Sequence, residues 1–135
     1  MPRRYQRKPP ESSSREERLR QIRAGAQTLR STCPSAALVN VKLDFLADAP
    51  QVHAAQAFVL YPGARAVFCY PCPYGDCDGI YDLSSEADQT LNRQRPRVAG
   101  ISRCPGSRSR TGQPKASCGL SVRYSIVAKH AQANA

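Results

Sequence analysis

Apolar and polar residues follow two different periods along the chain. In residues 14–31 the apolar side chains recur every three or four positions, at Leu19, Ile22, Ala26 and Leu29. Ser14 and Glu17 match the capping-box pattern that begins many helices. The spacing predicts an amphipathic helix over residues 14–31, whose narrow apolar side docks on the rest of the protein.

From Leu38 onward the period changes to two, which is typical of a half-buried strand. A second apolar run over residues 54–61 leads into Pro62 and Gly63 and then residues 65–70. Two apolar runs around a Pro-Gly turn predict a β-hairpin.

The last third of the chain adds one short helix and two strands. Ser84 and Ser85, together with Asp88, are suited to cap a short helix that runs through Leu91 and Gln94. Strands are predicted over residues 98–104 and 118–129, with a Gly-, Ser- and Pro-rich loop over residues 106–117 between them. The order of elements favours an α+β fold, with the N-terminal helix packed on an antiparallel β-sheet.

The length of 135 residues suits one domain. We expect a flexible basic tail over residues 1–13, a single domain over residues 14–129 and a second flexible tail over residues 130–135. Only 24 of the 135 residues are Leu, Ile, Val or Phe, which is less than a fifth of the chain. A highly charged chain in which these residues make up less than roughly 20% is typically disordered. Six cysteines indicate that disulfides or a metal replace part of the missing core.

The net charge of +10 is unevenly distributed. Residues 1–30 and 93–135 are strongly basic, whereas residues 31–92 carry more acidic than basic side chains. This distribution predicts a folded, slightly acidic middle between two basic segments.

Five of the cysteines fall between residues 69 and 118. Cys72 and Cys77 bracket a turn that contains Pro73 and Gly75, at the end of a predicted strand. A hairpin would bring Cys104 and Cys118 together across its mouth, so the two pairs supply the four thiolates that Zn²⁺ prefers.

Other fates remain open for these cysteines. Cys69 lies three positions before Cys72 and could replace Cys77 as a ligand, although it falls within a strand-like alternation. Disulfides and buried free thiols are further alternatives. Cys33 stands alone and is interpreted as a packing residue.

The four-cysteine arrangement resembles the zinc-ribbon class, in which a cysteine pair on one β-knuckle meets a second pair from another hairpin. The resemblance covers roughly residues 65–128. It implies a structural zinc site formed by Cys72, Cys77, Cys104 and Cys118, with a zinc-ribbon-like knuckle at one end of the sheet. The spacings depart from two short C-x2-C pairs, because four residues separate the first pair and 13 separate the second.

The motifs of several enzyme and membrane classes are missing. A zinc deaminase needs His-x-Glu followed by Pro-Cys-x-x-Cys, and neither histidine is followed by such a glutamate. A zinc ion with four thiolate ligands has no open position for water or substrate, so we expect a non-catalytic protein. The chain has no apolar stretch long enough to span a membrane and no export signal after its basic start, which predicts a cytoplasmic location.

The basic side chains point to nucleic acid as the first candidate partner. Sixteen of the 20 basic residues are arginines, whose guanidinium groups bind phosphate in a bidentate manner. The last hairpin and its loop concentrate such residues, and the predicted contacts are Arg103, Arg108, Arg110, Lys115 and Arg123. The alternative is a zinc-stabilised adaptor that binds an acidic protein partner and no nucleic acid; the oligomeric state is left open.

Overall fold

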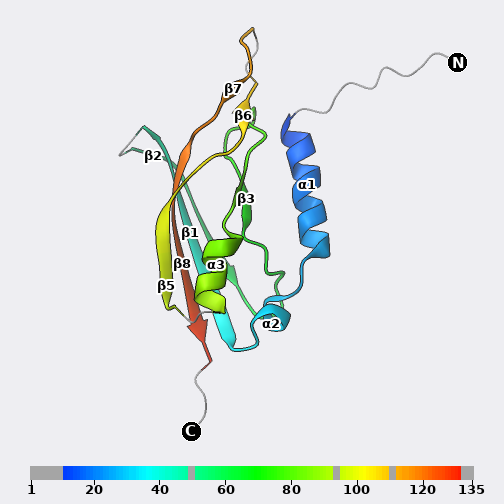
Figure 1. Ribbon diagram of the computed structural model, residues 1–135, viewed down its shortest axis with the longest axis vertical. Coiled ribbons are helices and arrows are strands. Elements are labelled where there is room, and N and C mark those ends of the chain that lie inside the picture. Colours follow the sequence, from blue (N-terminus) through cyan, green and yellow to red (C-terminus); the bar gives the residue numbers. More distant parts are fainter. Residues whose placement is uncertain (1–10, 49–50, 93–94, 110–111, 132–135) are drawn as a thin grey trace, which may run out of the picture.

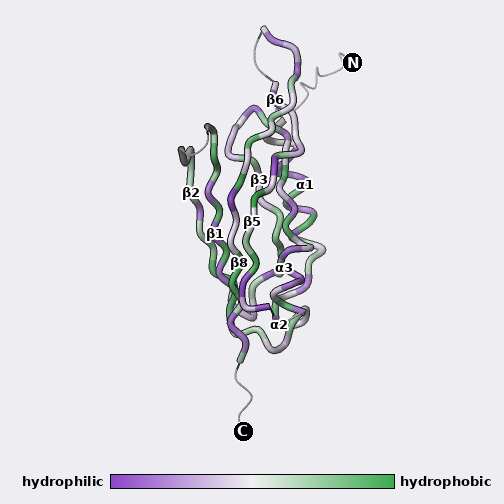
Figure 2. The backbone as a smooth tube through the Cα atoms, turned by 60° about the vertical axis from the view of Figure 1, so that its left-hand side comes forward, coloured by the Kyte–Doolittle hydropathy of each residue, from purple (hydrophilic) through white to green (hydrophobic). Residues whose placement is uncertain are grey.

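The computed structural model describes residues 11–48, 51–92, 95–109 and 112–131. A four-stranded antiparallel sheet forms one layer, and the helices lie on one side of it (Figures 1 and 2). The strand order is β2-β1-β8-β5, and the strands are β1 (Ala36–Asp48), β2 (Gln51–Leu60), β5 (Arg97–Arg103) and β8 (Ser121–His130). The predicted α+β class is confirmed.

Two short antiparallel sheets complete the strands. One pairs β3 (Cys69–Pro71) with β4 (Ile80–Asp82), and the other pairs β6 (Ser107–Arg108) with β7 (Ala116–Ser117). The helices are α1 (Glu11–Gly25), α2 (Leu29–Thr32) and α3 (Ser84–Leu91). Helix α3 packs against β8 and β5, whereas α1 packs against β3.

The core lies between the large sheet and the elements on its helical side. Alternate residues of β1, from Val39 to Phe45, are fully buried, and so are Val122 and Ile126 of the neighbouring β8. The ring of Phe45 meets the ring of Tyr81 from β4 at 5.6 Å between centroids. The alternation seen in the sequence therefore marks one buried side of the sheet, as a period of two requires.

The N-terminal helix differs from the prediction at both ends. Helix α1 begins at Glu11, so Ser14 lies within it and does not cap it, while residues 1–10 lie outside the described part. The helix ends at Gly25. A new helix, α2, begins after Thr28, whose hydroxyl accepts a hydrogen bond of 3.2 Å from the Ser31 N–H. The predicted continuous helix over residues 14–31 is wrong because Gly25 and the Thr28 cap separate two helices.

The predicted hairpin of residues 54–61 with residues 65–70 is also wrong. Strand β2 pairs with β1 along its length, and β3 pairs with β4. Residues 64–68 instead cross to the helical side, where the Ala66 N–H donates to the Gln27 carbonyl and Phe68 is buried. The 13-residue β1 offers β2 a longer partner than the short run after Pro62 and Gly63 could.

The later elements agree more closely with the sequence patterns. Strands β5 and β8 pair antiparallel, as expected. Helix α3 forms where predicted but ends at Leu91, with Asn92 as its C-cap, and Gln94 lies outside the described residues. The N-cap of α3 is Leu83, without a side-chain cap, and Asp82 accepts the Ser84 N–H instead of either serine capping the helix. His130, placed in a tail by the sequence, is the last residue of β8, and residues 132–135 lie outside the described part.

No helix in the described ranges combines the length and the apolar character that crossing a bilayer requires.

Candidate metal centre

Three separate parts of the chain bring four cysteines together. Cys72 and Cys77 lie in the turn between β3 and β4, here called the first cysteine turn (residues 72–79). Cys104 follows β5, in the second cysteine turn (residues 104–107), and Cys118 follows β7. Their four sulfur atoms lie within 4.8 Å of one another. The cluster could therefore hold one metal ion.

The sulfur–sulfur distances suit tetrahedral coordination. The Sγ atoms of Cys72 and Cys118 are 3.8 Å apart, and those of Cys77 and Cys104 are 3.6 Å apart. A regular tetrahedron with zinc–sulfur bonds of about 2.3 Å has edges of about 3.8 Å. All six cysteines are free of disulfides, and Cys72, Cys77 and Cys104 are buried.

Backbone N–H groups point at two of the sulfur atoms. The Gly79 N–H donates to Cys77 Sγ at 3.3 Å, and the Gly106 N–H donates to Cys104 Sγ at 3.4 Å. In both turns the donor lies two residues after the cysteine. Such contacts stabilise a thiolate and orient it toward a metal.

Burial makes the free thiols hard to ionise. It raises the pKa of the Cys104 thiol to about 12, although the Gly106 N–H acts in the opposite direction. Burial also raises the pKa of Cys72, and the neighbouring thiols add to this effect. Metal binding must therefore displace protons from the cluster, and a cation at its centre would offset the charge of four thiolates.

The two cysteine turns pack against each other through glycines. A Cβ atom on Gly79 would collide with the sulfur of Cys104, and one on Gly106 would collide with the backbone of Gly79. Asp78 joins the same contact, because its carboxylate accepts a hydrogen bond of 2.7 Å from the Ser107 N–H. This N–H is the main cause of the lowered pKa of Asp78. Only residues without a side chain allow this approach.

Arg15 of α1 is a buried part of this site that sequence reasoning missed. The residue is 5% exposed. Its Nη1 donates to the carbonyl oxygens of Cys72, Tyr74 and Cys77 at 2.9, 3.2 and 2.7 Å. Arg18 donates to the Asp78 carbonyl at 2.6 Å. Arg15 lies four residues before the buried Leu19 and therefore on the same side of the helix, and that spacing was the available signal.

The other two cysteines lie apart from the four. Cys69 is buried in β3, and burial followed by the charge of Asp82 raises the pKa of its thiol. Cys33 is buried in the core, where its thiol contacts the Leu91 carbonyl at 3.2 Å. The clustered set thus contains Cys77 and not the alternative Cys69.

The basic residues predicted to contact nucleic acid have different surroundings. Arg108 makes two hydrogen bonds to the Asp76 carboxylate, at 2.9 and 3.2 Å, and lies over the Tyr74 ring. Lys115 pairs with Asp78 at 3.3 Å, and Arg123 pairs with Asp44 at 3.1 Å. Arg103 is exposed at the end of β5, and Arg110 lies outside the described residues. The loop cations Arg108 and Lys115 thus join the loop over residues 106–117 to the first cysteine turn.

No protein-family model matches the chain, and no curated protein or solved structure is detectably similar to it. The fold and the site define a small α+β protein with a four-cysteine cluster that could hold a metal ion.

Proposed function

We propose that the protein is a small, non-catalytic zinc-binding protein whose metal site is structural. The observation that carries the proposal is the approach of four cysteine sulfur atoms to within 4.8 Å of one another. Zinc accepts four thiolates in tetrahedral geometry, and such a closed site leaves no position for substrate. The zinc-ribbon-like character of the turns is part of the same proposal.

A zinc ion here would stabilise a fold with few large apolar residues. Only 24 residues are Leu, Ile, Val or Phe. The ion would join the first cysteine turn to the segments that flank β6 and β7. Because these ligands converge only in the folded chain, the free energy of metal binding contributes directly to folding.

Metal analysis of protein purified without added zinc tests this function. We expect about one zinc per chain in the wild type and in Cys69→Ser. Cys77→Ser and Cys104→Ser should lose the metal and unfold at lower denaturant concentration. A wild type that is free of metal and unfolds at the same denaturant concentration with and without a chelator would refute the proposal. Retention of zinc by Cys77→Ser and its loss by Cys69→Ser would transfer the ligand role to Cys69.

Nucleic acid is the partner class that we propose for this zinc-binding protein, in a reducing compartment such as the cytoplasm. The net charge of +10 and the predominance of arginine support it. Binding driven by phosphate contacts weakens steeply as salt concentration rises. Titration of a labelled oligonucleotide at several salt concentrations tests this assignment, and an absence of binding at low salt would refute it.

The second candidate is a zinc-stabilised adaptor that binds another protein. The edge strand β2 favours it, because Phe58, Val59 and the adjacent Tyr61 are exposed large apolar residues. Exposed apolar side chains on an unpaired sheet edge are suited to protein contacts. An adaptor would co-purify with its partner after nuclease treatment, whereas a nucleic-acid-binding protein would lose its ligand.

A further inference from the structure

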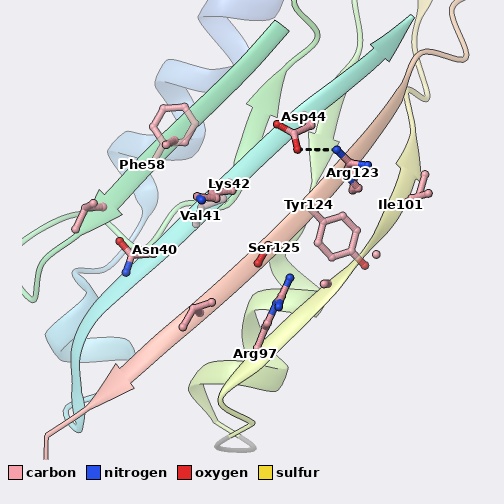
Figure 3. Close-up of a pocket in the computed structure, with 15 residues that line it drawn as sticks. Asn40, Val41, Lys42, Asp44, Phe58, Arg97, Ile101, Arg123, Tyr124 and Ser125 are labelled. Carbon is pink, nitrogen blue, oxygen red and sulfur yellow. Dashed lines mark hydrogen bonds and ion pairs between the residues drawn. The ribbon is translucent and has the colours of Figure 1, made fainter. Parts of the chain in front are cut away.

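The side of the large sheet that faces away from the helices forms an open depression of about 760 Å³ (Figure 3). One row across it consists of Ala57, Lys42, Ser125 and Ala99, which are paired in register across all four strands. Three of these four side chains are small, so the floor of the depression is low on either side of Lys42. Val59 and Ile101, which are 49% and 64% exposed, lie on the two edge strands. This surface is called the open face.

The open face is positively charged. Residues paired across neighbouring strands point to the same side of a sheet, and the register places these cations on the open face: Lys42, Arg97, Arg103, Arg123 and Lys129. Asp44 is the one carboxylate among the side chains that the structure describes on the open face, and it pairs with Arg123 (Figure 3). No described carboxylate forms an ion pair with Lys42 or Arg97, and both residues are exposed.

The loop over residues 106–117 is a weaker candidate for the same role. Arg108 and Lys115 are held by Asp76 and Asp78 of the first cysteine turn. A phosphate that binds there must compete with carboxylates already in place. On the open face, Lys42 and Arg97 have no such competitor among the described residues, so the electrostatic gain from a phosphate is larger.

The apolar surface on the open face favours binding of a single strand over binding of a duplex. Ala57, Ala99, Val59 and Ile101 are exposed between the cations. A duplex presents phosphates and groove edges, whereas a single strand also exposes the apolar faces of its bases. Four strands spaced about 4.8 Å apart make a surface about 14 Å wide, which a single strand can follow.

The geometry points to the open face as a binding surface for single-stranded nucleic acid. Lys42 and Arg97 contact the phosphates, and the small and apolar residues between them contact sugars and bases. Phe58 and Tyr124 also line the depression (Figure 3). Contacts to phosphates and to the faces of bases tolerate any sequence, so the binding has little sequence preference. This inference rests on the proposed nucleic-acid function and names the surface that performs it.

The test compares two double variants that change the net charge equally. Lys42→Glu with Arg97→Glu reverses charge on the open face. Arg23→Glu with Arg30→Glu makes the same change at exposed positions on the helical side. The probe is a fluorescein-labelled oligothymidylate, titrated into zinc-loaded protein whose metal content and melting temperature match those of the wild type.

We expect the open-face variant to bind about tenfold more weakly or worse, and the helical-side variant to stay within about twofold of the wild type. The slope of log affinity against log salt should fall by about 1.4 in the open-face variant, because each phosphate contact on a single strand contributes about 0.7.

Five results would overturn the inference. Equal loss in both double variants would show that net charge alone drives binding, and unchanged binding in the open-face variant would place the contact elsewhere. Either result is compatible with the proposed nucleic-acid function and contradicts only the assignment of the open face. Equal affinity for a duplex, or for polyglutamate, would refute the single-strand assignment. If the wild type itself binds no oligonucleotide at low salt, the proposed partner class fails together with the inference.

Discussion

Arg15 donates a hydrogen bond of 2.7 Å to the carbonyl oxygen of Cys77, and the thiol of Cys77 lies 3.6 Å from that of Cys104. Cys77 therefore belongs both to the docking site of α1 and to the cysteine cluster. The first cysteine turn has N–H groups directed at sulfur and carbonyl groups directed at a guanidinium. Ordering one side of this turn orders the other, so docking of α1 and metal binding should stabilise each other.

Replacing Arg15 tests that coupling. Arg15→Ala leaves the carbonyls of Cys72 and Cys77 without their charged donor in a buried place, and hydrogen bonds to charged groups contribute about 1.5–3 kcal/mol each. We expect a loss of about 3 kcal/mol in the free energy of unfolding, together with weaker metal binding. Arg15→Lys should recover only part of both, because an ammonium group does not reproduce the planar guanidinium. Urea unfolding and chelator competition measure the two quantities.

The matched control is Arg20→Ala on the same helix. Arg20 pairs with Glu17 at 2.7 Å, and its side chain is 75% exposed. Exposed pairs of this kind contribute little, so the variant should stay within about 0.5 kcal/mol of the wild type. Equal effects of the two substitutions would mean that Arg15 acts only through helix propensity.

The sequence predicts those features that depend on a local period or on residue chemistry. Alternation at Val39, Val41 and Leu43 identifies the central strand, because one side of the sheet is buried. Cys104 and Cys118 are predicted to meet because a hairpin joins them, and β5 does pair with β8.

The remaining features depend on contacts between distant parts of the chain. The spacing of Arg15 from Leu19 places it on the docked side of the helix, but the carbonyl groups of residues 72–77 that bind it lie about 60 residues away in the chain. The pairing of β2 with β1 was missed because the Pro-Gly turn suggested a different local partner. The ion pairs of Arg108 and Lys115 with Asp76 and Asp78 also connect the loop to a turn about 30 residues away, so the sequence shows the charges without their partners.

Adding a methyl group at Gly79 should disrupt the cluster. The Cβ atom of Gly79→Ala would collide with Cys104 Sγ and press on the second cysteine turn. Overpacking of this kind costs about 1–3 kcal/mol, and displacement of Cys104 should weaken metal binding as well. Gly75→Ala is the control, since a Cβ there meets nothing within 4 Å. If both variants bind cobalt with the same affinity and the same thiolate absorption, the close packing of the two turns is unimportant for the site.

The stability that Asp82 provides should depend on pH. Hydrogen bonds from Ser84 lower the pKa of this carboxyl group below its usual value of 3.8. A lowered pKa in the folded state means that the charged form stabilises the fold above the usual pKa, and that this contribution is lost as pH falls through the folded-state pKa. The difference in unfolding free energy between the wild type and Asp82→Asn should therefore shrink between about pH 5 and about pH 3. Because both proteins contain the same cysteine cluster, acid release of metal cancels in this difference. A gap that widens on acidification would contradict the assignment.

The edge strand β2 should be the segment through which the protein self-associates at high concentration. Gln51–Leu60 contains no Lys, Arg, Asp, Glu, Pro or Gly, and Phe58 and Val59 are exposed on it. The opposite edge strand, β5, begins and ends with arginine and follows Pro96. Charged residues and proline protect a sheet edge from pairing with another chain, so β5 is protected in this way and β2 is not.

Val59→Lys should reduce the weight-average mass measured by sedimentation at high concentration, because it places a charge on the unprotected edge strand β2. Ile101→Lys introduces a lysine on the same side of the sheet but on the protected edge strand β5, and it should leave that mass unchanged. A larger effect of Ile101→Lys would assign the association to the open face or to β5.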